Sequence, residues 1–262
     1  MKKYEGMLLC TDVDHTLIAS DGSLSAESTE AINYFMENGG MFTLSSGRPP
    51  LYLTKFHNDF IPNVPVICHN GATLYDYKSA EYIRTVWLNE EKAVKPLMYA
   101  IDSYLEYIKC ITFYSLNYQR QYNADSAADF TTEEFIDEFS SMKKNKYLIS
   151  FTSESLAHNV QRTFATDPSY DGIFDFSRSW SYGVEALPFD GNKGSGVVYL
   201  KKHLGNVTKT ICVGDFENDI PMLKVADIAY AVSNACIDAK NVAHKITVSN
   251  DESPIAKVIS EL

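Results

Sequence analysis

Short apolar runs alternate with segments of helical periodicity over the first ninety residues. Three runs predict buried strands: GMLLCT, MFTLSS and VPVICH. Ser25 to Asn38 has apolar residues at helical spacing and stops at two glycines, and RPPLYLTKFHNDF is compatible with a second helix. A β-hairpin turning near Tyr77 to Ala80 is expected after the third run. This order of strands and helices predicts a parallel sheet with helices on both faces.

The end of the chain repeats this pattern. GNKGSGVVYLKKHL and NDIPMLKV read as helices, the runs TICVG, IAYAV and KITVS as strands, and a last helix ends at Leu262.

The region from about Arg84 to Leu187 has a different character. Helical stretches over 90–104, 132–139 and 154–165 alternate there with the strands IKCITFYSL, NKYLISFT and IFDFS. We therefore predict an α/β protein whose core comprises residues 1–83 and 188–262. An α+β domain is expected to be inserted at 84–187.

Composition narrows the possible partners and location. The chain has 262 residues, with 23 Lys plus Arg against 34 Asp plus Glu, for a formal charge of −11. An acidic surface repels polyanions, so nucleic acid is not expected as a partner. The sequence shows neither a signal peptide nor an apolar stretch long enough to span a membrane. Five cysteines without Cys-x-x-Cys spacing favour a reducing cytoplasm.

Two groups of polar residues follow the first two predicted strands. Asp12 and Asp14 follow the first strand, and residues two apart in an extended segment point the same way. Ser46, Gly47 and Arg48 follow the second strand and offer a hydroxyl and a glycine amide to an anion. Because ligand sites in parallel sheets lie at the carboxyl ends of strands, both groups can belong to one site. Each alone is better explained as a turn or a helix cap.

Two further groups lie in the last third of the chain. Asp215, Asn218 and Asp219 belong to GDFEND, which follows TICV and places carboxylates where a hard cation can be held. Lys193 stands in GNKG at the start of a predicted helix and can bring a positive charge to a phosphate. Taken together, the four groups supply a nucleophile, an acid, anion donors and a magnesium site. Phosphoryl transfer needs that combination.

The motifs DVDHT, SGR, KG and GDFEND, in this order, resemble those of the haloacid dehalogenase superfamily of phosphatases. Segments such as Asn70-Gly71-Ala72 and VEALPFDGNKG are similar to the Cof-type branch, also called family IIB, so the resemblance covers essentially the whole chain. It implies a Rossmann-like core carrying an α+β cap domain that selects the substrate and closes over the site. It also implies a phosphoric monoester hydrolase acting on a small soluble phosphomonoester, such as a sugar phosphate, with Mg²⁺ as cofactor.

The resemblance also implies roles for individual residues. Asp12 is expected to attack phosphorus and form an aspartyl phosphate, and Asp14 to act as general acid and then as base. Magnesium is expected on the side chains of Asp12 and Asp215 and on the carbonyl of Asp14. Asp219 is expected to support either Lys193 or a metal-bound water. Four residues are expected to bind the phosphate. The four phosphate-binding residues are Ser46, Gly47, Lys193 and Asn218.

Some positions depart from the family pattern or keep two interpretations. His15 stands where the family usually has Gly, and it is either an exposed loop residue or a catalytic one. Ser253 and Pro254 replace a common Gly-Val pair. Glu185 either contacts substrate or belongs to a hinge.

Two other functions remain open at this stage. One is a phosphomutase of the same superfamily, and the other is a non-catalytic regulator that binds a sugar phosphate. The sequence leaves the physiological substrate, the residues that select it and the oligomeric state undetermined.

Overall fold

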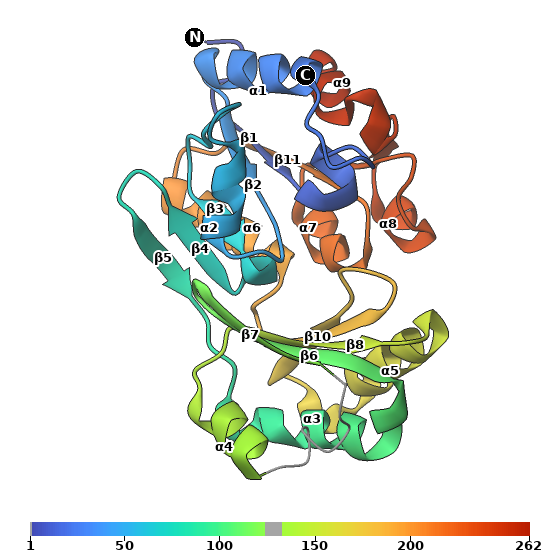
Figure 1. Cartoon of the computed structure of the whole chain (residues 1–262). Coiled ribbons are helices and arrows are strands. Elements are labelled where there is room, and N and C mark those ends of the chain that lie inside the picture. The colour runs from blue at the N-terminus through green and yellow to red at the C-terminus, as the bar shows by residue number, and fades with distance from the viewer. Residues whose placement is uncertain (1, 124–132) are drawn as a thin grey trace. The chain divides into compact units, whose positions relative to one another are not determined.

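A computed structural model describes residues 2–123 and 133–262 of the chain (Figure 1). It divides into two compact units, which we call the core unit (Met1–Arg84 and Asn192–Leu262) and the inserted unit (Thr85–Gly191). The junctions predicted from the sequence, 83/84 and 187/188, lie near these bounds. Each unit has its own cluster of buried apolar side chains.

The core unit contains two sheets and the helices around them. Its strands are β1 (Met7–Thr11), β2 (Met41–Leu44), β3 (Val66–Cys68), β4 (Thr73–Asp76), β5 (Glu81–Thr85, whose last residue belongs to the inserted unit), β11 (Lys209–Gly214), β12 (Ile228–Ala231) and β13 (Lys245–Ile246). Its α-helices are α1 (Ala26–Glu37), α2 (Pro50–Leu53), α6 (Lys193–Leu204), α7 (Ile220–Val225), α8 (Ile237–Val242) and α9 (Pro254–Ser260). Its short irregular turns are η1 (Val13–Leu17), η2 (Thr54–Phe56), η3 (His69–Gly71), η7 (Glu217–Asp219) and η8 (Asn250–Glu252).

The main sheet of the core unit is parallel, as the strand and helix order predicts. Its strand order is β13-β12-β11-β1-β2, and a parallel bridge between Ser45 and Ile67 connects β2 to the antiparallel sheet β3-β4-β5. Figure 1 shows the α1 and α9 pair on one side of β1 and β11, and α6 and α7 on the other. The predicted α/β class with helices on both faces is confirmed.

Local sequence explains where these elements begin and end. β1 is buried along almost its whole length, which is why it reads as a continuous apolar run rather than as an alternating one. Helix α1 begins where the Ser25 side chain accepts a hydrogen bond from the Ser28 amide. Helix α6 ends at Gly205, whose φ of 72° is the left-handed conformation that glycine adopts without strain.

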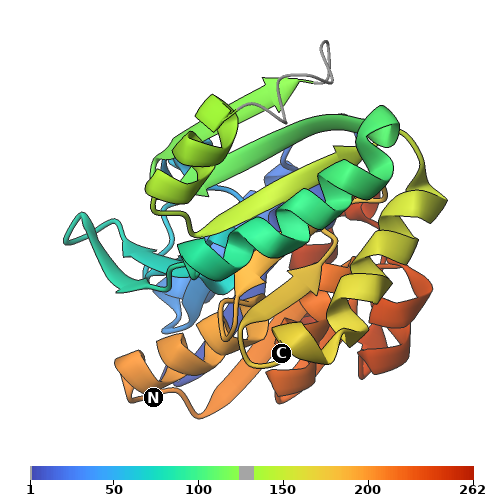
Figure 2. The ribbon, with the colours of Figure 1, turned by 90° about the horizontal axis from the view of Figure 1, so that it is seen from below.

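The inserted unit is an antiparallel sheet with helices. Its elements are α3 (Glu90–Tyr104), η4 (Leu105–Tyr107), β6 (Ile108–Ser115), β7 (Tyr118–Asn123), α4 (Glu133–Ser141), β8 (Lys146–Phe151), α5 (Glu154–Thr166), η6 (Pro168–Tyr170), β9 (Phe174–Ser177) and β10 (Gly183–Pro188). The strand order is β7-β6-β8-β10-β9, with every pair antiparallel. In Figures 1 and 2, α3, α4 and α5 cover one face of this sheet. Thr132, the expected start of the second helix, lies outside the described residues.

Two strands of the inserted unit were not expected from the sequence. β7 is an exposed edge strand of mostly polar residues, so it has no apolar run to identify it. β10 is buried along its whole length, but the sequence analysis assigned no strand to this segment. KITVS, expected as a full strand, forms only the two-residue β13.

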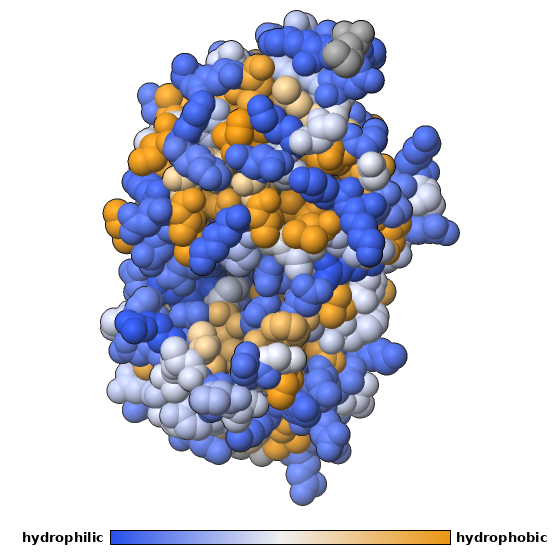
Figure 3. All heavy atoms as spheres, turned by 180° about the vertical axis from the view of Figure 1, so that it is seen from behind, coloured by the Kyte–Doolittle hydropathy of each residue, from blue (hydrophilic) through white to orange (hydrophobic). Residues whose placement is uncertain are grey.

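The surface carries no single large apolar area on the face drawn in Figure 3. Apolar and polar residues are interspersed across it. Within residues 2–123 and 133–262, no helix is both long enough and apolar enough to cross a bilayer.

Candidate active site

The carboxyl ends of three neighbouring strands bring together residues that are far apart in the sequence. Asp12 directly follows β1, Asp215 follows β11, and Ser46 lies just beyond β2. Because β11, β1 and β2 are adjacent and parallel, these residues lie at one edge of the sheet. The site therefore depends on the main sheet of the core unit.

Lys193 is the buried cation of this edge. It begins helix α6, where the Asn192 side chain caps the helix by accepting a hydrogen bond from the Ser195 amide. Its Nζ lies 2.5 Å from Asp12 Oδ1 and 2.6 Å from Asp219 Oδ1. Burial alone lowers the pKa of a lysine, but the charges of these two carboxylates outweigh it and raise the pKa of Lys193. The ammonium therefore stays charged at neutral pH.

Asp219 uses both of its carboxylate oxygens for contacts within the protein. Oδ1 binds Lys193, and Oδ2 accepts hydrogen bonds from the backbone amides of Asp215 (2.8 Å) and Phe216 (3.2 Å). The side chain is fully buried. Asp219 thus fixes the loop after β11 and orients the lysine.

Asp12 and Asp215 are carboxyl groups buried in an excess of negative charge. Burial, together with the charges of Asp12 and Asp219, raises the pKa of Asp215 to about 9. Lys193 and the hydrogen bond that Thr16 Oγ1 donates to Asp215 Oδ1 at 3.0 Å act in the opposite direction. Burial likewise raises the pKa of Asp12 to about 7, although Lys193 opposes this. Three carboxylates thus face one lysine, and the lysine does not balance them.

This donor set fits a divalent metal. Asp12, Asp215 and Asp219 each place a carboxylate oxygen within 4.8 Å of the others. Carboxylate oxygens are the ligands that hard cations such as Mg²⁺ prefer, and a cation offsets the excess negative charge. Since both oxygens of Asp219 already accept hydrogen bonds, Asp12 and Asp215 are the two carboxylates best suited to bind it.

Asp14 lies in a sharp bend. The backbone of His15 has a φ of 60°, the left-handed conformation that a glycine adopts easily, which explains why glycine suits this position. The His15 side chain is exposed, and its carbonyl accepts a hydrogen bond from Asn234 Nδ2. After this bend the Asp14 carboxylate is not part of the buried group around Lys193. It binds Arg48 instead.

Arg48 is the functional candidate to which the sequence analysis assigned no role. Its Nε lies 2.8 Å from Asp14 Oδ2, and its Nη2 lies 2.7 Å from Asp14 Oδ1. The guanidinium has the largest effect in lowering the pKa of Asp14, against the opposing effect of burial. The SGR motif already contained this residue, but only the fold shows that it reaches Asp14.

The remaining predicted phosphate-binding residues lie at neighbouring strand ends. Ser46 is buried, and its Oγ accepts a hydrogen bond from the Arg48 amide, while Gly47 is half-buried. Asn218 is buried, and its Nδ2 donates to Asn70 Oδ1 at 3.2 Å. Asn70 thus joins the end of β3 to the GDFEND loop.

The turn after β3 also packs against the start of α6. His69, Asn70 and Gly71 have positive φ values of 50°, 55° and 104°. A Cβ on Gly71 would lie 1.9 Å from the carbonyl oxygen of Asn192, so a side chain cannot be placed there. Gly71 therefore allows the close approach that places the segment carrying Lys193.

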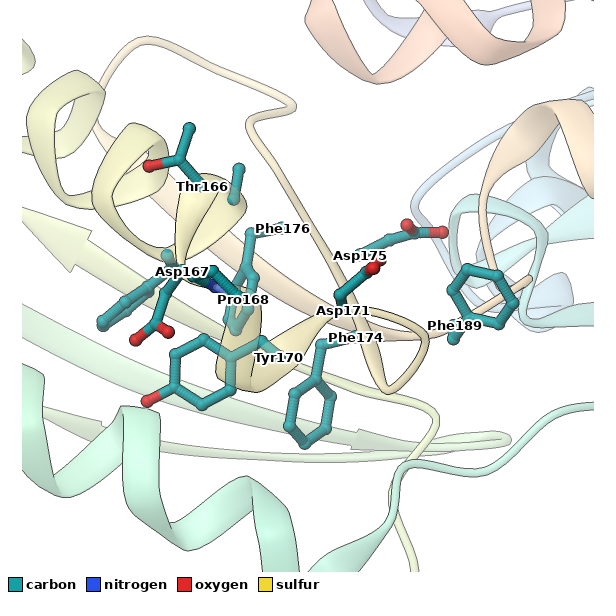
Figure 4. Close-up of a pocket in the computed structure, with 11 residues that line it drawn as sticks. Thr166, Asp167, Pro168, Tyr170, Asp171, Phe174, Asp175, Phe176 and Phe189 are labelled. Carbon is teal, nitrogen blue, oxygen red and sulfur yellow. The ribbon is translucent and has the colours of Figure 1, made fainter.

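A hollow of about 380 Å³ is lined by residues of the inserted unit. Its walls include Tyr170, Phe174 and Phe189, together with three aspartates (Figure 4). The carboxylates of Asp167 and Asp175 point in opposite directions, and Asp167 Oδ1 caps the short η6 turn through the Ser169 amide. Its acidic groups do not converge on a common point, in contrast to those of the core unit.

The model of the haloacid dehalogenase-like hydrolase family matches residues 9–259. The chain belongs to this family. The match spans both units, and the predicted membership of the superfamily is confirmed. Together with the curated phosphatases below, it identifies the chain as an enzyme of the phosphatase class.

Curated and solved relatives cover nearly the whole chain. The 5-amino-6-(5-phospho-D-ribitylamino)uracil phosphatase YwtE of Bacillus subtilis is 24% identical, over 97% of this chain and 97% of its own. The pyridoxal phosphate phosphatase YbhA of Escherichia coli is 22% identical, over 96% of this chain and 97% of its own.

Among solved structures, the HAD subclass IIB sugar phosphatase BT4131 superposes with a TM-score of 0.76 at 21% identity. The superposition covers 97% of this chain and 98% of that one.

Proposed function

We propose that this hydrolase is a magnesium-dependent phosphatase of a small phosphomonoester, such as a sugar phosphate, and that Asp12 carries the phosphoryl group. One observation carries the proposal: Asp12 lies at the end of β1, in hydrogen-bond contact with the buried Lys193 and beside the carboxylates of Asp215 and Asp219. The relatives named above act on small phosphorylated compounds. The identity of the substrate is left open.

In the first step Asp12 attacks the phosphorus. Lys193 binds Oδ1, so we assign the attack to Oδ2. The new bond joins Oδ2 to phosphorus while the bond from phosphorus to the leaving oxygen breaks. Asp14 enters this step in its protonated form, which the Arg48 contact makes the minor one at neutral pH, and gives its proton to that oxygen. Lys193 offsets the negative charge that a carboxylate meets when it approaches a phosphate.

In the second step water attacks the aspartyl phosphate. Asp14, now ionised, takes a proton from the water as its oxygen bonds to phosphorus, and the bond from phosphorus to Asp12 breaks. Ser46, the Gly47 amide and Asn218 are proposed to bind the other phosphoryl oxygens. Asp219 holds Lys193 in place throughout.

Asp12 and Asp215 would bind Mg²⁺ through their side chains, and Asp14 through its backbone carbonyl. When bound, the ion supplies positive charge at the transferring phosphoryl group. The inserted unit is proposed to select the substrate. All five cysteines are free thiols, which supports a reducing, cytoplasmic location.

The test is a phosphate-release screen. The purified chain is incubated with sugar phosphates, nucleotide and flavin precursors and pyridoxal phosphate, with Mg²⁺ or with excess chelator. We expect Mg²⁺-dependent release from at least one compound, and little release with Ca²⁺, whose longer and looser coordination misplaces the nucleophile. Asp12→Asn is the matched control, and it should release none.

The same screen tests the alternatives. Full activity in excess chelator would refute the metal assignment. Conservation of organic phosphate with a hexose bisphosphate activator would indicate a phosphomutase. Tight binding of a phosphorylated compound without any turnover would indicate a regulator.

A further inference from the structure

The contact between Arg48 and Asp14 fixes the orientation of a carboxylate. Each of the two Asp14 oxygens accepts a hydrogen bond from a different guanidinium nitrogen, at 2.7 and 2.8 Å. This two-point contact sets both the rotation and the plane of the carboxylate, which a single charge does not do. The geometry therefore specifies where each oxygen of Asp14 lies.

Arg48 is itself held from several sides. Its backbone amide donates to Ser46 Oγ at 3.2 Å, and its carbonyl accepts from the His69 amide at 3.2 Å. Its guanidinium carbon lies 4.4 Å from the centre of the Tyr52 ring, within the range of a cation–π contact. The ends of β2 and β3 thus fix the backbone of Arg48, and a ring from α2 supports its side chain.

Asp14 needs such support more than Asp12 does. The Asp12 side chain is 9% exposed and is bound by Lys193, whereas that of Asp14 is 37% exposed and follows a left-handed bend. A half-exposed ion pair adds little to stability, because water screens it. Orientation is different, since a small misplacement of a proton donor has a large effect on the rate.

We propose that Arg48, supported by Tyr52, is a positioning residue that orients the Asp14 carboxylate for proton transfer to the leaving group. This inference rests on the proposed function, because it takes Asp14 as the general acid. Arg48 acts through Asp14, so its loss affects the rate of the first step and leaves substrate binding unchanged.

The experiment compares two substrates that differ in their need for a proton. An alkyl phosphate that the wild-type enzyme hydrolyses has a basic leaving oxygen, whereas the nitrophenolate of 4-nitrophenyl phosphate leaves without protonation. The first-step rate and KM are measured for both by rapid-quench kinetics. Arg48→Ala should slow the alkyl phosphate by about tenfold or more, part of the contribution of a general acid, and the aryl phosphate by much less.

Further variants separate position from charge. Arg48→Lys keeps the charge but loses the two-point contact, so it should recover only part of the rate. Lys55→Ala removes another positive charge that acts on Asp14, without a fork, and should leave the ratio of the two rates unchanged. Tyr52→Ala should slow the alkyl phosphate severalfold, while Tyr52→Phe keeps the ring but loses the hydroxyl and should slow it less. Methylguanidinium should partly restore Arg48→Ala.

Several outcomes would overturn the proposal. Equal slowing of both substrates would indicate a general structural defect, and a raised KM with an unchanged rate would place Arg48 on the substrate. An unchanged or faster first step would also contradict it. If Arg48→Ala does not fold, Tyr52→Ala tests the same point with the ion pair intact. A wild-type chain that hydrolyses no phosphomonoester would instead refute the proposed function.

Discussion

Two of the buried lysines, Lys193 in the core unit and Lys146 in the inserted unit, have different surroundings. In the core unit, Lys193 binds Asp12 and Asp219, and Asp215 adds a third buried carboxylate. In the inserted unit, Lys146 binds Glu185, whose other oxygen accepts a hydrogen bond from Ser179 at 2.6 Å.

The core cluster holds more negative charge than Lys193 offsets. Burial raises the pKa of both Asp12 and Asp215, and the neighbouring carboxylates also raise it, against the opposing effect of Lys193. A structure that only needed stability would not retain such an excess, whereas a site that binds a cation and a phosphoryl group can use it. Lys146 and Glu185 instead form a one-to-one ion pair within the buried sheet, so each charge offsets the other. The comparison predicts that substitutions in the core cluster abolish turnover, whereas substitutions in the Lys146 and Glu185 pair lower the stability of the fold.

The largest effect on turnover is expected at Asp12. Asp12→Asn removes the nucleophile, so no substrate should be hydrolysed above background and no aspartyl phosphate should form. Asp14→Asn keeps the nucleophile but lacks the acid and the base. With an aryl phosphate it should release one equivalent of alcohol and then stall as the phosphorylated enzyme.

A burst experiment with mass analysis of the quenched protein measures both variants. If Asp12→Asn shows the burst and Asp14→Asn does not, the two roles are reversed.

The next largest effect is expected at Lys193. Lys193→Ala should lower kcat on the order of a hundredfold or more, because it removes charge that stabilises the transferring group. Lys193→Arg should recover only part, since a planar fork does not replace a compact ammonium. Steady-state kinetics with saturating Mg²⁺ measures this effect. Unaltered turnover in Lys193→Ala would place the residue outside the site.

The proximity of Asp12, Asp215 and Lys193 was predictable from the sequence, but their individual contacts were only partly so. The strands that end at Asp12 and Asp215 are continuous apolar runs, and parallel strands bring their carboxyl ends to one edge. The contact of Arg48 with Asp14 depends on the bend at His15 and on the reach of a long side chain. Neither follows from spacing along the chain. The sequence therefore placed Arg48 in the SGR motif but predicted no role for it.

The inserted unit was harder to predict for a different reason. β7 is recognisable only through its pairing with β6, because its own residues are polar and exposed. Glu185 kept two interpretations in the sequence, and the structure places it within β10, 1% exposed and bound to Lys146. Strand β7 and the environment of Glu185 both depend on pairing between neighbouring strands. The hydrophobic periodicity of a single segment does not reveal such pairing.

A smaller effect on turnover is expected for the pair in the inserted unit. Glu185→Gln leaves the Lys146 ammonium buried without its carboxylate, which should lower the free energy of unfolding by about 3–5 kcal/mol. At temperatures where the variant is folded, the first-step rate should stay within a fewfold of wild type. The double variant Lys146→Met with Glu185→Leu should recover most of the stability.

Thermal melting and rapid-quench kinetics measure both properties. A tenfold rise in KM without a change in melting temperature would instead favour contact between Glu185 and substrate.

The smallest effect is a dependence of stability on pH in the metal-free protein. The pKa of Asp215 is raised to about 9 and that of Asp12 to about 7, both from an unfolded value near 3.8. Between the unfolded pKa near 3.8 and its raised pKa in the folded protein, each carboxyl holds a proton that the unfolded chain has lost. Stability therefore falls as pH rises from 3.8 to about 7 for Asp12 and to about 9 for Asp215. Each excess proton corresponds to about 1.4 kcal/mol per pH unit.

Melting temperature in excess chelator is measured from pH 7.5 to 9, above the range where most histidines titrate. We expect it to decrease with pH, and to decrease less with Mg²⁺, because a bound cation favours the ionised carboxylates. Asp215→Asn is the matched control, since it keeps an acceptor for Thr16 but has no proton to lose, and its melting temperature should change least. If the wild type without metal became more stable over this range, the core cluster would not hold an excess of buried negative charge, and its contrast with the Lys146 pair would fail.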